Sequence, residues 1–221
     1  MSSIPENQAE DTAAAEAVAP VVGGVVAAAR KRPKPGERRV QILQTLAAML
    51  EQPGAERITT AALAAKLDVS EAALYRHFAS KAQMFEGLIE FIEQSVFTLA
   101  NQITERESVG QVQAQKVLTV LLQFGEKNPG MTRVMVGDAL VYENERLQQR
   151  MNQFFDKIEA TLRQVLRGAA NAEGSATPSV DAQVRAAALT AFVVGQLQRF
   201  ARSGFRRAPS EHLEATIALI V

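Results

Sequence analysis

The sequence predicts an all-α protein of about nine helices, in which a short helix-turn-helix unit precedes a larger helical domain. Apolar residues recur at three- and four-residue steps along most of the chain, and Pro-Gly and Gly-rich stretches separate these segments. No stretch shows the alternation of apolar and polar residues that is typical of a β-strand. With 221 residues, of which 47% are hydrophobic, the chain can bury one large core or two small ones.

Composition excludes several kinds of chemistry. Lys and Arg number 24 and so do Asp and Glu, so a nucleic-acid interface has to be a local patch. The absence of cysteine excludes disulfides and thiolate metal sites and fits a reducing cytoplasm. The two histidines, His77 and His212, are too far apart in sequence to indicate a metal centre. Since the chain also has no nucleophile elbow and no phosphate loop, we expect neither an enzyme nor a cofactor.

Residues 1–36 are predicted to be a disordered Ala/Val-rich tail that ends in a basic arm. Acidic residues precede the apolar stretch 12–29, which Pro20 interrupts, so it fits neither a signal peptide nor a membrane span. From Arg30 to Arg39 there are six basic residues and one acidic residue. Such an arm suits a phosphate backbone, and the alternative is a solvated linker.

Residues 37–81 are predicted to form the DNA-binding domain. Its first helix runs from about Glu37 to Glu51 and ends before Pro53-Gly54. The later helices of this region each follow a capping hydroxyl. They are expected over 61–67 after Thr59 or Thr60, over 71–77 after Ser70, and from Ser80 to about Thr104.

Residues 82–221 are predicted to form a helical dimerisation and partner-binding domain. Beyond the helix that ends near Thr104, the expected elements are helices over 111–126, 131–141 and 143–167, a loop over 168–179, a helix over 180–203 and a terminal helix from about Pro209. The last two helices are apolar on too many sides for a pair exposed to solvent. They therefore predict a homodimer with a four-helix interface, and the alternative is that both lie in the monomer core.

The segment 58–81 has the pattern of a helix-turn-helix. Ile58, Leu63, Leu67 and Leu74 supply an apolar brace, and the second helix is left to enter the major groove of duplex DNA. Short side chains at the start of this second helix are expected to approach base edges. Longer side chains, and the N-termini of the helices, are expected to contact phosphates. The predicted DNA-binding residues are Thr59, Thr60, Ser70, Glu71, Ala72, Tyr75, Arg76, His77 and Lys81. Taken singly, each also has a structural explanation, such as a helix cap for Thr59 or Ser70.

The run ITTAALAAKLDVSEAALYRHFASKAQMF, residues 58–85, resembles the signature of the TetR family. The most specific part is Tyr75-Arg76-His77-Phe78, a small spacer, and then Ser80-Lys81. This resemblance implies a TetR-like fold and a homodimer that binds palindromic sites in double-stranded DNA. It also implies a C-terminal domain that, in most members, binds a small ligand.

Further stretches resemble the nucleoid occlusion factors within that family. They are LIEFIE at 88–93, FGEKNPGMTR at 124–133 and RLQQRMNQFF at 146–155. The resemblance implies a cell division inhibitor, activated by DNA, that sits on the nucleoid as one or several dimers per site and requires no membrane. It implies binding to the C-terminal tail of the tubulin-like protein FtsZ and antagonism of FtsZ polymers.

In that group the FtsZ tail docks near the fourth and fifth helices, which implies Phe91, Lys127 and Asn128 as the binding residues here. Leu99 and Gln123 depart from the basic and the small residue expected in that groove. From the residues alone, Phe91 is interpreted as a core residue and Asn128-Pro129-Gly130 as a helix stop.

The alternative function is a transcriptional repressor that a small ligand releases from DNA. It requires an enclosed cavity among the helices of the second domain. The expected walls of this cavity are Phe124, Val134, Met135 and Phe155.

Overall fold

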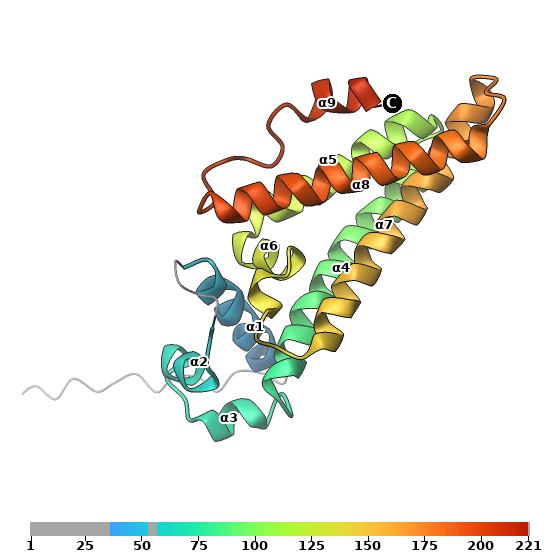
Figure 1. Cartoon of the computed structure of the whole chain (residues 1–221). Helices are drawn as coiled ribbons and strands as arrows, with labels where there is room; N and C mark the ends of the chain where they lie inside the picture. Colours follow the sequence, from blue (N-terminus) through green and yellow to red (C-terminus); the bar gives the residue numbers. More distant parts are fainter. Residues whose placement is uncertain (1–35, 53–56, 221) are drawn as a thin grey trace, which may run out of the picture. The chain divides into compact units, whose positions relative to one another are not determined.

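The computed structural model describes residues 36–52 and 57–220, and all regular structure in these ranges is helical (Figure 1). The helices are α1 (Glu37–Leu50), α2 (Thr60–Leu67), α3 (Glu71–Tyr75), α4 (Lys81–Arg106), α5 (Gly110–Lys127), α6 (Pro129–Met135), the 3₁₀ helix η1 (Asp138–Leu140), α7 (Glu145–Ala172), α8 (Pro178–Arg202) and α9 (Leu213–Ile220). The predicted all-α class, with about nine helices, is confirmed. The predicted tail and arm up to residue 35 and the helix stop at Pro53-Gly54 fall outside the described residues.

Side-chain caps begin three of the first four helices, as the sequence predicts. Thr59 accepts a hydrogen bond from the backbone N–H of Ala62, and Ser70 accepts one from Ala73. Between them, the backbone of Asp68 takes the left-handed conformation, with φ 55°, and so ends α2. Each cap satisfies a backbone donor that the helix itself leaves unpaired, which fixes where α2 and α3 begin.

The side chain of Arg39, on α1, contacts the two residues His77 and Phe78 that follow α3. Arg39 donates a hydrogen bond to the carbonyl oxygen of His77 at 2.9 Å, and its guanidinium lies 4.0 Å from the centre of the Phe78 ring. Phe78 is itself fully buried in the core. Arg39, which the sequence places in the basic arm, therefore packs the three-helix unit together.

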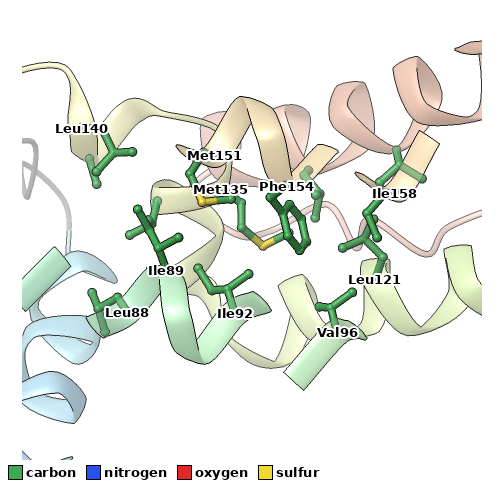
Figure 2. Close-up of a cluster of buried hydrophobic side chains, with 14 of the residues drawn as sticks. Leu88, Ile89, Ile92, Val96, Leu121, Met135, Leu140, Met151, Phe154 and Ile158 are labelled. Atoms are coloured by element: carbon green, nitrogen blue, oxygen red, sulfur yellow. The ribbon is translucent and has the colours of Figure 1, made fainter. Parts of the chain in front are cut away.

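The core of the second domain lies between α4, α5 and α7. Ile92 and Val96 of α4, Leu121 of α5, and Phe154 and Ile158 of α7 are completely buried and meet in one apolar cluster (Figure 2). Their spacing of three and four residues places each set on one helix face.

Ion pairs on the surface hold α7 beside α4. Arg146 pairs with Glu86 at 2.5 Å, and Arg150 pairs with Glu93 at 2.5 Å. The hydrogen bond with Glu93 raises the pKa of the Arg150 guanidinium above its ordinary value. These pairs fix how the first turns of α7 lie along α4.

Four predicted boundaries are wrong. The single helix expected over 131–141 is broken at Gly137, whose φ of 86° separates α6 from η1. The loop expected over 168–179 is helical as far as Ala172, so Gly168 lies inside α7. Helix α3 ends at Tyr75 instead of His77, and α9 begins at Leu213 instead of near Pro209.

Among the described helices, none has the length and apolar character to cross a membrane.

Gly130 marks a close approach between α6 and α1. A Cβ at this position would lie 2.0 Å from the carbonyl oxygen of Ala47, which is closer than any real contact. We expect Gly130→Ala to lower the free energy of unfolding by about 1–3 kcal/mol, because the two helices have to separate. Urea unfolding followed by circular dichroism measures the change.

Gly168 provides the matched control within a helix. A Cβ there meets no atom within 4 Å, so alanine causes no clash in the folded protein. In the unfolded chain, alanine has less conformational freedom than glycine. Gly168→Ala should raise stability by about 0.5–1 kcal/mol. Equal effects of the two substitutions would contradict the close approach at Gly130.

The packing role of Arg39 is also testable. Arg39→Met removes the hydrogen bond to His77 and the contact of the charge with Phe78, so it should cost about 1–2 kcal/mol of unfolding free energy. Its neighbour Arg38 bonds to Gln41 on the same helix, so Arg38→Met should change stability by less than about 0.5 kcal/mol. Thermal unfolding of both variants distinguishes the two roles, and equal losses would refute the difference.

Candidate functional site

The outward face of α3 carries the side chains that the sequence predicts to meet DNA. Ser70, Glu71, Ala72, Tyr75, Arg76 and His77 are all exposed. Leu74, between them, is fully buried against the core, so α3 is anchored by its inner face. The small side chain of Ala72 keeps this surface low near the start of the helix, which allows close approach of another macromolecule.

A chain of hydroxyl groups joins the start of α2 to α3. The hydroxyl of Thr60 donates a hydrogen bond to Oε2 of Glu71 at 2.6 Å, and the Tyr75 hydroxyl lies 3.5 Å from Thr60 Oγ1. Three predicted DNA-binding residues are therefore brought together across the turn. Thr59 lies beside them, exposed, with its hydroxyl in use as the cap of α2.

Lys81, another predicted DNA-binding residue, forms an ion pair with a residue that is distant in the sequence. Its ammonium forms an ion pair with Glu143, whose side chain is only 9% exposed, and lies 5.7 Å from the centre of the Phe85 ring. Glu143 belongs to the segment that leads into α7, and the sequence gives no signal for this pairing. A phosphate near Lys81 would share the ammonium with Glu143 or take its place.

A second surface is formed by α4 and α5. Phe91 is 47% exposed, and its ring centre lies 6.3 Å from that of the half-buried Phe124. The alternative of a core position for Phe91 is therefore wrong. We call the exposed face around Phe91 and Phe124 the aromatic patch. An exposed aromatic ring that rests on a second ring is typical of a surface that binds a partner.

The end of α5 borders the aromatic patch. Lys127 is exposed in the last turn, where its positive charge also complements the helix dipole. Asn128 is half-buried, and its side-chain amide donates to the carbonyl oxygen of Phe124 at 2.8 Å. Asn128 thus ends α5 and fixes the backbone below Phe124. Leu99, two turns after Phe91 on α4, and Gln123, directly before Phe124 on α5, are also exposed.

Helix α8 leaves an apolar stripe open to solvent. Val180 is 60% exposed and Val184 is 63% exposed, and Ala187, Ala188 and Ala191 continue the stripe at helical spacing. The opposite face of α8 is buried against α7 and α5. The remaining alternative, in which α8 is wholly enclosed in the monomer, does not fit this exposure.

The walls expected for a ligand cavity are largely core. Val134 and Met135 are buried, and Met135 lies in the same cluster as Phe154 (Figure 2). A cleft of about 790 Å³ lies between the end of α4, the start of α5 and the second half of α7, and its lining residues include Thr104, Gln113 and Gln164. Among the residues that the structure describes, no three His, Cys, Asp or Glu side chains gather as a metal site would require.

Comparison with known proteins shows the family to which the chain belongs. Residues 42–88 match the family described as "Bacterial regulatory proteins, tetR family", and residues 109–221 match "Tetracyclin repressor-like, C-terminal domain", a SlmA-like domain. The structure of the TetR-like regulator from Rhodococcus sp. RHA1 has a TM-score of 0.67 at 18% identity, covering 85% of this chain and 97% of that chain. PfmR from Thermus thermophilus has a TM-score of 0.65 at 22% identity, with 81% and 96% covered. These structures confirm the TetR fold.

Curated relatives are more similar in sequence. The nucleoid occlusion factor SlmA of Vibrio vulnificus is 52% identical over 188 residues, which cover 85% of this chain and 95% of the relative. The SlmA protein of Photobacterium profundum is 53% identical over 182 residues, which cover 82% and 92%. The chain therefore belongs to the family of the nucleoid occlusion factor SlmA, within the TetR-type DNA-binding regulators.

Proposed function

We propose that this protein is a cell division inhibitor that acts from the chromosome. As a homodimer it binds palindromic duplex DNA, and in the DNA-bound state it binds the FtsZ C-terminal tail and antagonises FtsZ polymers over the nucleoid. The observation that carries this proposal is the aromatic patch, in which Phe91 of α4 is 47% exposed and its ring lies beside that of Phe124. The membership of the chain in the SlmA family supports it.

Duplex binding rests on the exposed face of α3. Residues at the start of such a helix approach base edges, while the helix N-termini and the longer side chains bind phosphates. One short helix reads only a few base pairs, so useful specificity needs two half-sites. A two-fold symmetric dimer supplies them and accounts for a palindromic target.

The stripe on α8 is the surface that we propose joins the two protomers. Its small side chains allow a second copy of α8 to approach closely, and the exposed Leu219 of α9 extends the apolar surface. The arginines at its end, Arg199, Arg202, Arg206 and Arg207, are exposed and would form a polar rim.

Tail binding rests on the aromatic patch and Lys127. The two rings offer apolar contact to an extended peptide, and the ammonium of Lys127 favours acidic groups on it. Because α4 carries Phe91 and also begins at the DNA-binding unit, both partners would bind along one helix. A repressor that a small ligand releases from DNA is less well supported, because Val134 and Met135, two of the expected cavity walls, are buried in the apolar core cluster.

Substitution of Phe91 tests the tail-binding surface. Phe91→Ala should weaken binding of a fluorescent FtsZ tail peptide to the protein–duplex complex by about tenfold or more, as loss of a central aromatic contact does. Fluorescence anisotropy measures the affinity with and without cognate duplex. DNA binding itself should be unchanged.

Tyr142→Ala is the matched control, because Tyr142 is an exposed aromatic residue outside the aromatic patch. Tail affinity should then stay as in the parent protein. A parent protein that binds the tail equally with and without duplex, or an equal loss in both variants, would refute the proposed function.

A charge on the α8 stripe tests the dimer. Ala188→Glu places a carboxylate in an apolar interface, so the protein should sediment as a monomer at concentrations where the parent is a dimer. Binding to a palindromic duplex should fall by about a hundredfold or more, since each half-site is then bound alone. Ala160→Glu, at an exposed position of α7, should remain dimeric, and a dimeric Ala188→Glu variant would exclude this interface.

A further inference from the structure

Glu71 is an unusual residue for a surface that approaches DNA. It is exposed at the first position of α3, where we propose that the helix enters the major groove. A carboxylate there is repelled by the phosphate backbone and weakens binding to every sequence. Its presence needs a compensating contact in the complex or a purely structural reason.

The carboxylate of Glu71 is held in a fixed direction. Thr60 donates to Oε2 at 2.6 Å, and the Tyr75 hydroxyl stands behind Thr60 at 3.5 Å. A hydroxyl that donates to a carboxylate forms a strong, charge-assisted hydrogen bond. Because this bond engages one carboxylate oxygen, Oε1 has the capacity to accept a hydrogen bond from another donor.

The surroundings of Glu71 leave room for a base edge. Ala72 follows it on the exposed face, and the neighbouring Ser70 is occupied as the cap of α3. Small side chains on both sides let the backbone of α3 approach the floor of the groove. Glu71 is therefore the longest acceptor at the start of this helix.

We infer that Glu71 reads a cytosine in each half-site of the DNA target, with Thr60 and Tyr75 as positioning residues. In the major groove, the N4 amino group of cytosine is the donor that Glu and Asp accept from. The carboxylate of Glu71 would reject guanine and thymine at that position, because both bases present acceptor oxygens to it. This inference rests on the proposed DNA binding and adds the base that the site selects.

Selection from a random duplex library provides the test. The parent protein should enrich a palindrome with one symmetric cytosine position that depends on Glu71. With Glu71→Ala, preference at that position alone should disappear, and the ratio of specific to non-specific affinity should fall by about tenfold to a hundredfold. Affinity for non-specific duplex should stay equal or rise at low salt, because a negative charge has been removed.

Two further variants separate base reading from a structural role. Glu71→Gln keeps an acceptor for Thr60 and should shift the preference towards adenine, which glutamine contacts through two hydrogen bonds. Glu105→Ala removes a charge at the far, exposed end of α4 and should leave the selected sequence unchanged. Circular dichroism checks that each variant retains its helices.

An unchanged cytosine preference in Glu71→Ala and Glu71→Gln would overturn the inference and leave Glu71 a structural partner of Thr60. That result would leave DNA binding itself intact. A parent protein that enriches no sequence at all would instead overturn the proposed function, and the inference with it.

Discussion

Helix α4 joins the unit formed by α1, α2 and α3 to the second domain without a break, and the arrangement of both depends on it. This helix starts at the Ser80 cap, directly after the three-helix unit, and continues for 26 residues, which is about 39 Å of rise. Its inner face contributes Leu88, Ile92 and Val96 to the core, and its outer face presents Phe91. Arg146 and Arg150 of α7 form ion pairs with Glu86 and Glu93 in the first half of α4. The proposed DNA surface and the aromatic patch are thus attached to one rigid element.

Apolar side chains are packed between α4, α6 and α7. In the present chain, Met135, Phe154 and Ile92 occupy the space between α4, α6 and α7 (Figure 2). In the proposed function, an effect of DNA on the aromatic patch would pass through α4 and its contacts. The ion pair of Lys81 with Glu143 lies at the end of α4 nearest the proposed DNA surface.

Local patterns in the sequence are sufficient to predict most of the fold. Helical periodicity locates the helices, and hydroxyl caps at Thr59, Ser70 and Ser80 fix three starting points, because both signals depend on neighbouring residues. Glycine disfavours helices, so the sequence predicts a loop at Gly168, yet packing of α7 against α8 extends the helix past it. The outward face of α3 is also predictable. The pairing of Lys81 with Glu143, 62 residues apart, follows only from tertiary structure.

We propose that DNA and the FtsZ tail bind two separate surfaces joined by α4. Hydrogen exchange followed by mass spectrometry tests this arrangement. Cognate duplex should slow amide exchange over residues 59–81. Added tail peptide should slow it over residues 88–95 and 120–128, with little change in α8. Protection by the tail only at α8 and α9, or no protection by duplex at α3, would contradict this account.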